Sequence, residues 1–327
     1  MLFSPGMIPA GQRPVVSILM ATRDNLPTLP RALATFLESP IDLEIVIVND
    51  GSTDGTRAYL DSLPPERVRP IHLEKSQGLT LSLNQAFAVS RGEYLARQDA
   101  DDASHPDRLQ FQLKAFREDP ALDILGTGNR ILDEEGEVLA EVVGHNYGNA
   151  LKRLRAGNFF CHGSLMLRRS AMERLGAYRP FFRYSQDLDL LLRAAAMGLK
   201  MRNLIPCLYD WTLSEKAISR SKSREQGLFA KTAKSASRDA DLDLATCYAR
   251  LETESAADEA ASGPIPRDWQ IMEILLLCGD TAGARRKYAE LRERGAPMPK
   301  PGFAVRMRVL PSWLYRAVRI LADLRYA

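Results

Sequence analysis

Short and almost unbroken apolar runs alternate with helical segments through the N-terminal part of this sequence. The runs cover residues 15–21, 43–48, 68–73 and 94–97, and the third of them contains Pro70. Strands that are apolar along their whole length are buried on both faces, as in a parallel sheet, whereas a proline favours a sheet edge. The alternation therefore predicts an α/β fold with a doubly wound, Rossmann-like, mostly parallel sheet and right-handed crossovers.

The pattern changes in the next part of the chain. Residues 124–132 and 138–143 flank the turn segment Asp133-Glu-Glu-Gly136, which predicts a hairpin and therefore a mixed sheet. Two further short strands are expected at 200–205 and 208–211.

Capping residues indicate where several helices begin. Ser104 is a candidate N-cap with Pro106 in the first turn, and Ser170 and Glu173 have the spacing of a capping box. A helix that begins at Gln186 would carry two aspartates in its first turn, where the helix dipole favours negative charge.

Composition excludes several classes of protein. The 44 basic and 41 acidic residues nearly balance, which gives no support for nucleic-acid binding. The four cysteines lie far apart, as in a reducing compartment, so we expect a cytoplasmic protein. Residues 1–13 lack the basic and apolar segments of a signal peptide, and no apolar run reaches the ~20 residues of a membrane-spanning helix.

The C-terminal part is polar and helical in pattern. Residues 252–266 predict a linker, and 267–294 predict a helical hairpin that packs on the preceding domain. Residues 310–326 place an apolar stripe beside several arginines, which suits either peripheral contact with the cytoplasmic membrane face or packing on the chain's own domain. We divide the chain into an N-terminal tail (1–14), an α/β domain (15–223) and a helical C-terminal region (224–327).

Three aspartates, Asp99, Asp101 and Asp102, directly follow the apolar run 94–97. In an open α/β sheet, ligands bind at the carboxyl ends of the strands, and alternate carboxylates on one loop suit a hard divalent cation. The alternative is a solvated acidic loop, in which Asp102 caps the following helix.

An ordered set of motifs surrounds this acidic stretch. They are Val48-Asn-Asp-Gly-Ser-Thr-Asp54, Gly78-Leu-x-x-Ser-Leu-Asn84, Asp99-Ala-Asp-Asp102, His162-x-Ser164 and Asp187-Leu-Asp189. The set resembles the family 2 glycosyltransferases of the GT-A fold over residues 15–223. That resemblance implies inverting transfer of a sugar from a nucleotide-diphosphate donor, usually a UDP-sugar, to an acceptor hydroxyl with Mn²⁺ or Mg²⁺. The acceptor would be a bacterial-type surface glycan or a lipid-linked glycan.

The resemblance also implies a role for individual residues. The donor-binding candidates are Ala21, Thr22, Arg23, Asp50, Gly78, Asp99, Arg220 and Lys222. Asp101 matches the family's metal-binding aspartate, with Asp99 reaching the metal or the ribose, and Asp187 matches the catalytic base. His162 and Gln186 would lie on the acceptor side, although Gln186 stands where the family often has glutamate.

Structural roles compete for several of these residues. Asp50 suits a turn before Gly51, His162 suits a structural position before a strand, and Asp189 suits a helix N-terminus. Arg220 and Lys222 also suit a solvated basic segment.

Two other functional classes remain to be distinguished. A nucleotide-sugar-binding assembly protein without turnover is compatible with Gln186 and the helical C-terminal region, whereas Asp101 and Asp187 favour an enzyme. A nucleotidyltransferase would carry a Gly-rich loop after the first strand, and Ala21-Thr-Arg-Asp-Asn25 is not one. The segment Trp211-Thr-Leu-Ser214 lacks the Gln-x-x-Arg-Trp pattern of processive relatives, so we expect one sugar per encounter.

Overall fold

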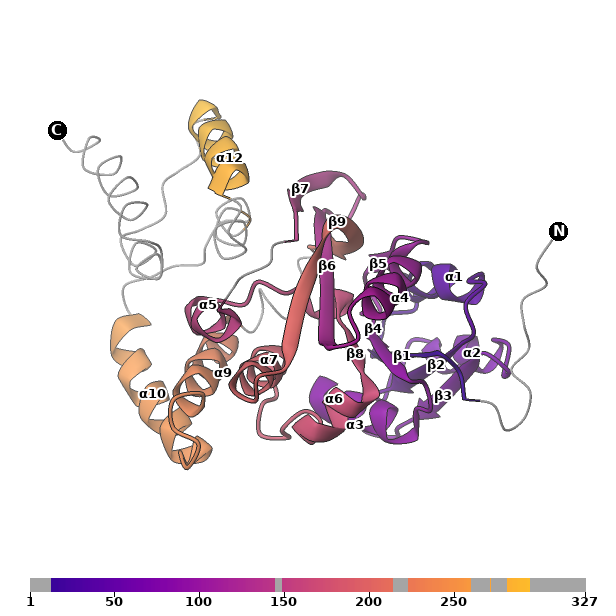
Figure 1. Cartoon of the computed structure of the whole chain (residues 1–327), viewed down its shortest axis with the longest axis horizontal. Coiled ribbons are helices and arrows are strands. Elements are labelled where there is room, and N and C mark those ends of the chain that lie inside the picture. The colour runs from indigo at the N-terminus through magenta and orange to yellow at the C-terminus, as the bar shows by residue number, and fades with distance from the viewer. Residues whose placement is uncertain (1–12, 145–148, 214–222, 260–270, 272–280, 295–327) are drawn as a thin grey trace.

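The computed structural model describes residues 13–144, 149–213, 223–259, 271 and 281–294 (Figure 1). Arg220, Lys222 and the segment 310–326 lie outside the described residues, so the predictions made for them stay predictions.

One twisted sheet forms the centre of the described chain. Its nine described strands run in the order β3-β2-β1-β4-β8-β6-β9-β5, and β7 pairs with β6. The strands are β1 (Val16–Thr22), β2 (Leu43–Asn49), β3 (Val68–His72), β4 (Tyr94–Arg97), β5 (Ala103–Ser104), β6 (Leu122–Leu132), β7 (Val138–Val142), β8 (Met166–Arg168) and β9 (Lys200–Thr212). β1 to β4 are parallel, β8 is antiparallel to β4 and β6, and β6 is parallel to β9. The predicted mixed, mostly parallel sheet is confirmed, as is the hairpin of β6 and β7.

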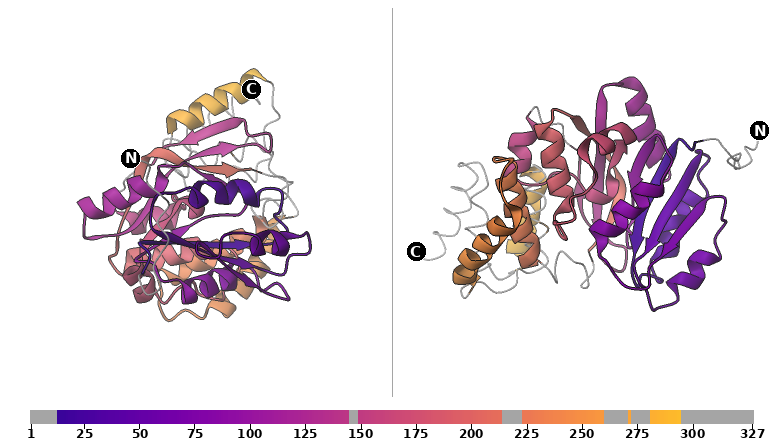
Figure 2. Two further views of the ribbon diagram at one scale, coloured as in Figure 1. Left: turned by 90° about the vertical axis from the view of Figure 1, so that its right-hand side faces the viewer. Right: turned by 90° about the horizontal axis from the view of Figure 1, so that it is seen from below.

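Helices cover both faces of this sheet. They are α1 (Leu29–Leu37), α2 (Thr56–Asp61), α3 (Leu79–Val89), α4 (Arg108–Glu118), α5 (Ala150–Ala156), the 3-10 helix η1 (His162–Ser164), α6 (Arg169–Leu175), α7 (Gln186–Ala196), α9 (Ser223–Ala236), α10 (Leu244–Glu259) and α12 (Thr281–Glu293). Successive side chains of a strand point to opposite faces, so Ile18 joins the cluster under α1 and α4 while Leu19 joins the cluster under α3 and α7. Figures 1 and 2 show the two layers.

The helices after residue 223 pack on the α/β domain. Phe229 and Ala233 of α9 belong to the same buried cluster as Leu188 and Leu191 of α7, and α10 lies against α9 (Figure 2). α10 continues to Glu259, so the predicted linker is wrong over 252–259. The Ala and Glu residues that suggested a linker are also strong helix formers.

Three local predictions are corrected by the structure. The strands expected at 200–205 and 208–211 form the single strand β9, because bulges against β6 accommodate Pro206. Ser104 lies in β5 and does not cap a helix, since α4 begins after Asp107. Ser170 lies inside α6, which begins at Arg169, so it is not an N-cap.

Candidate active site

Hydrogen bonds join the loops that follow β1 and β2. Asp24 has a left-handed backbone with φ 52°. Its Oδ1 accepts from the Thr53 N–H at 2.7 Å, and its own N–H donates to Ser52 Oγ at 3.0 Å. The Leu26 N–H donates to Asp54 Oδ2, also at 3.0 Å. The two loops therefore form one surface at the carboxyl ends of the parallel strands, where ligands bind in open α/β folds.

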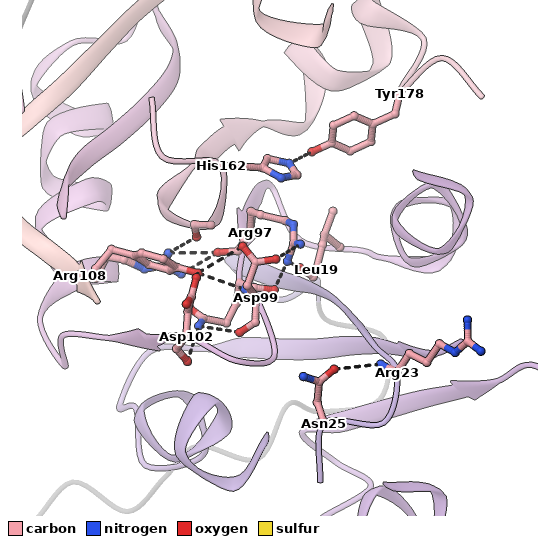
Figure 3. Close-up of polar contacts among 12 residues, drawn as sticks. Leu19, Arg23, Asn25, Arg97, Asp99, Asp102, Arg108, His162 and Tyr178 are labelled. Carbon is pink, nitrogen blue, oxygen red and sulfur yellow. Dashed lines mark hydrogen bonds and ion pairs between the residues drawn. The ribbon is translucent and has the colours of Figure 1, made fainter. Parts of the chain in front are cut away.

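Three of the predicted donor contacts, Ala21, Thr22 and Arg23, lie at the end of β1 or just after it. The hydroxyl of Thr22 is buried and has no hydrogen-bond partner among the described residues. The Arg23 guanidinium is exposed and lies 3.7 Å from Asp24, while the Arg23 N–H donates to Asn25 Oδ1 at 3.3 Å (Figure 3). The exposed Arg23 cation at this end of the strands is able to bind an anionic ligand.

Asp50 and Gly78, both donor-binding candidates, are in contact. The Asp50 carboxylate accepts hydrogen bonds from Ser76 Oγ at 2.6 Å, Gln77 N–H at 2.7 Å and Gly78 N–H at 3.0 Å. Burial raises the pKa of Asp50, but these hydrogen bonds outweigh it and hold the pKa below its usual range. Gly78 has φ 89°, a conformation that favours glycine. Asp50 is therefore an ionised carboxylate that holds the loop before α3.

β9 holds in place the segment Asp99-Ala-Asp-Asp102, which we call the acidic loop. The Tyr209 hydroxyl accepts from the Asp99 N–H at 3.2 Å and donates to Asp102 Oδ2 at 2.8 Å. The Thr212 N–H donates to Asp102 Oδ1 at 2.8 Å. Both oxygens of Asp102 thus bind β9, so the alternative in which Asp102 caps the following helix is wrong.

The other two aspartates of the loop differ in their partners. Asp99 forms an ion pair with Arg97, which is buried at the end of β4 (Figure 3). The carboxylate of Asp101 has no ion-pair partner in the described part of the chain, and its backbone carbonyl accepts from Arg31 at 3.3 Å. Burial, together with the charge of Asp99, raises the pKa of Asp101 to about 6.

This donor set fits a divalent cation that is shared with a substrate. No group of three potential metal-binding side chains occurs in the described residues. Mg²⁺ sites commonly use one or two carboxylates together with substrate phosphates, and Asp99 and Asp101 supply that number. Their mutual repulsion, which contributes to the raised pKa of Asp101, is the kind that a bound cation relieves.

Arg108 is a buried cation that the sequence analysis did not identify. Its guanidinium donates to the carbonyl oxygens of Arg97 at 3.0 Å and Gly163 at 2.7 Å (Figure 3). It also lies over the rings of Phe36 and Tyr209, 5.5 Å from each centroid. Burial lowers the pKa of Arg108 to about 10, so it stays protonated at neutral pH. Arg108 thereby joins the end of β4 to η1.

His162 pairs with Tyr178 between the acidic loop and α7. The two side chains share a hydrogen bond of 2.9 Å between Nε2 and the hydroxyl (Figure 3). Burial, followed by the positive charge of Arg97, lowers the pKa of His162 to about 4, so the ring is neutral at physiological pH. The charges of Asp187 and Asp99 both act on His162 and Tyr178, which places this pair within electrostatic range of the two carboxylates.

The two aspartates of α7 have different environments. Asp189 is buried and pairs with Arg179 and Arg193, so it has the structural position that its sequence context also allowed. Asp187 is only partly buried and accepts a hydrogen bond from Asn158 Nδ2 at 2.7 Å. Gln186 is 5% exposed at the first position of the helix.

The structure thus places most of the predicted site residues at the end of the sheet where β1, β2 and β4 have their carboxyl ends. Residues missed from the sequence include Arg108, Tyr209 and Asn158, which hold the others in place. A lone arginine on a predicted helix, a tyrosine in a strand and an asparagine after a helix give no motif by which to find them.

The chain is similar to known glycosyltransferases. The model of the family "Glycosyl transferase family 2" matches residues 17–176. The putative glycosyltransferase EpsE of Bacillus subtilis (strain 168) is 32% identical over 213 residues, which cover 63% of this chain and 76% of EpsE. The O-antigen biosynthesis glycosyltransferase WbnJ of Escherichia coli is 32% identical over 187 residues, 55% of this chain and 72% of WbnJ.

A solved structure supports the same fold. Staphylococcus aureus TarS 1–349 in complex with UDP-GlcNAc superposes with a TM-score of 0.57 at 16% identity, covering 71% of this chain and 69% of that chain. The family match, the relatives and this superposition agree with the resemblance drawn from the motifs. The chain belongs to glycosyltransferase family 2 and is a glycosyltransferase enzyme with the GT-A fold.

Proposed function

We propose that this enzyme transfers one sugar per encounter from a nucleotide-diphosphate donor, a UDP-sugar, to an acceptor hydroxyl with inversion at the anomeric carbon. The observation that carries the proposal is the position of η1: Gly163 lies against Asp99 of the acidic loop, and the adjacent His162 shares a hydrogen bond of 2.9 Å with Tyr178. The charge of Asp187 on α7 also acts on this His162–Tyr178 pair. A donor diphosphate at the acidic loop would therefore lie near a partly exposed carboxylate that is able to act as a base.

The residues of the chain divide the work between donor and acceptor. Arg23 and the surface formed by the first two loops bind the nucleotide, next to the loop that Asp50 holds. Asp99 and Asp101 would hold the divalent cation, which when bound would offset the charge of the diphosphate leaving group. Asp187 removes the proton of the acceptor hydroxyl as that oxygen attacks the anomeric carbon, and attack opposite the diphosphate inverts the configuration.

His162 has a positioning role in this scheme. Because it is neutral at physiological pH, it does not act as a cationic acid. Its ring instead holds Tyr178 next to the site through their hydrogen bond.

The relatives and solved structures support a UDP-sugar donor and a glycan acceptor. TarS is known in complex with UDP and with UDP-GlcNAc, and the names of WbnJ and of TuaG from Bacillus subtilis (strain 168) refer to O-antigen and teichuronic acid biosynthesis. We therefore place the enzyme in the synthesis of a bacterial surface polysaccharide, with a glycan or lipid-linked acceptor.

A donor screen tests the proposal directly. UDP-, GDP- and dTDP-sugars are added to the full chain with Mn²⁺, and the melting temperature and the release of nucleoside diphosphate are measured. Only bound donors should raise the melting temperature. Proton NMR of the transferred sugar then gives its anomeric configuration. Retention of configuration, or consumption of no UDP-sugar in the presence of glycan acceptors, would overturn the proposal.

Membrane contact is a separate expectation. No helix in the described residues is long and apolar enough to cross a membrane. For the segment 310–326 we keep the sequence-based expectation of contact with the cytoplasmic membrane face, where a lipid-linked acceptor would be found. Sedimentation with anionic vesicles at low salt tests it, and a full chain that stays in the supernatant would show it to be wrong.

A further inference from the structure

We infer that Asn158 is the positioning residue of the catalytic base, because it holds one oxygen of Asp187 and leaves the other for the acceptor hydroxyl. This inference rests on the proposed function, in which Asp187 is the base. Asn158 follows α5 in the sequence, whereas Asp187 lies in the first turn of α7. Nothing in the sequence motifs connects the two residues.

The hydrogen bonds of Asn158 determine which way its amide faces. Asn158 Oδ1 accepts from the Phe160 N–H at 3.0 Å, and Nδ2 donates to Asp187 Oδ2 at 2.7 Å. A backbone N–H only donates and an ionised carboxylate only accepts, so the reversed amide would lose both bonds. The side chain therefore presents an N–H donor to Asp187.

The segment that carries Asn158 is itself fixed. The carbonyl of Phe159 accepts a hydrogen bond of 3.1 Å from Asn203 Nδ2 on β9. Phe159 and Phe160 lie in the same buried cluster as Leu188 of α7. The donor and the base are thus attached to elements that pack in one cluster, as a positioning role requires.

One oxygen of Asp187 remains for chemistry. No described residue donates a hydrogen bond to Asp187 Oδ1, whereas Oδ2 is occupied by Asn158. Asp187 is only partly buried, so an acceptor is able to reach it. A general base has to lie within hydrogen-bond reach of the proton that it removes, and a misplacement of 1 Å costs up to about 100-fold in rate.

Asn158→Asp removes the N–H donor to Asp187, and it also places a second carboxyl group beside that base. An aspartate keeps the size of asparagine and the oxygen that accepts from Phe160, but it loses the N–H donor to Asp187. We expect kcat to fall about 10-fold to 100-fold with little change in the donor KM. Because the added charge is itself able to lower kcat, Asn158→Ala is measured beside it, since alanine removes the donor without adding charge. If Asn158→Ala leaves kcat close to that of the wild-type enzyme, the positioning role is wrong.

A double-mutant cycle shows whether Asn158 acts through Asp187. The cycle uses Asn158→Ala, Asp187→Asn and the pair, with single-turnover rates measured from radiolabelled donor so that low rates are quantified. Once Asp187 is replaced, Asn158→Ala should cause no further loss. Asn149→Ala is the matched control, because it removes the hydrogen bond of 2.9 Å from the Lys152 N–H at the other end of α5. It should lower the melting temperature and leave kcat unchanged.

The outcomes separate this inference from the proposed function. If Asp187→Asn leaves kcat unchanged, Asp187 is not the base, and both the proposed mechanism and the inference are overturned. If Asp187→Asn removes activity while Asn158→Asp does not lower kcat, or if the losses in the cycle multiply, only the role of Asn158 is overturned. Donor binding measured by thermal shift confirms that each variant is folded.

Discussion

The backbone of Gly163 lies against the hydroxyl of Tyr209 so closely that no β-carbon fits between them. A β-carbon there would also come within 2.8 Å of Asp99 Oδ2. The same hydroxyl binds the Asp99 N–H and the Asp102 carboxylate. η1 and the acidic loop therefore share one contact point on β9, and a change at any of these residues affects both.

Gly163→Ala should disturb this contact. The new methyl group has no space, so η1 has to move, and overpacking of this kind typically costs about 1–3 kcal/mol of stability. We expect a lower melting temperature and a loss of Mn²⁺-dependent activity. Gly227→Ala in α9 is the control, because no neighbouring atom lies within 4 Å of the position that a β-carbon would take there and alanine favours a helix. Equal effects of the two substitutions would contradict this account.

Tyr209→Phe should weaken metal-dependent activity while the ring contact with Arg108 remains. The substitution leaves a buried carboxylate and a backbone N–H without a shared partner, which typically costs about 1–3 kcal/mol. Because the acidic loop loses this support, we expect half-maximal activity at a higher Mn²⁺ concentration. A titration with Mn²⁺ measures the shift, and an unchanged titration curve would show that the hydroxyl does not hold the loop for the cation.

Asp101→Asn and Asp102→Asn should differ in their effect on the melting temperature. The side chain of Asp101 holds no described element in place, so its replacement should remove Mn²⁺-dependent transfer and weaken UDP binding while the melting temperature is retained. Asp102 binds Tyr209 and Thr212, so its replacement should lower the melting temperature. Activity assays and thermal unfolding of both variants provide the comparison, and full activity of Asp101→Asn would exclude the proposed metal site.

His162 should make the protein less stable in acid. Its pKa is about 4 in the folded protein, below the usual value of about 6.5, so the unfolded chain binds the proton first. Stability is therefore complete above pH 6.5 and falls between pH 6.5 and 4, by up to about 3 kcal/mol. Denaturant unfolding of the wild-type protein and of His162→Gln across this range isolates the contribution. The variant should show the shallower decline, and parallel curves would contradict the lowered pKa.

The elements visible in the sequence were those with a periodic pattern. Apolar runs predicted β1, β2 and β4, and Pro70 predicted the edge position of β3, because burial on two faces and a missing N–H leave clear traces in a chain. β5 has only two residues and no period, so the sequence predicts a loop there with Ser104 as a cap. Pro206 divided the pattern of β9, although the bulges against β6 keep the strand continuous.

The sequence predicts candidate site residues where function requires particular residue types, and it does not reveal the residues from distant parts of the chain that support them. Asp101 and Asp187 are proposed from motifs whose order is recognisable. Arg108, Tyr209 and Asn158 act through contacts with backbone atoms or with residues far away in the sequence. Such contacts depend on the fold as a whole and leave no spacing pattern.

The contact between Asp99 and Tyr209 also has a consequence for the order in which we expect a newly made chain to acquire its parts. β1 to β4 find their parallel partners within the first 97 residues, so this half of the sheet is able to form early. The hydrogen bond from Asp99 to Tyr209 forms only after Tyr209, 110 residues further along the chain, has been synthesised. During synthesis on the ribosome, we therefore expect the surface formed by the first two loops to form before the acidic loop is held in place. A nascent chain shorter than 209 residues has no group in the place of Tyr209 to hold that loop.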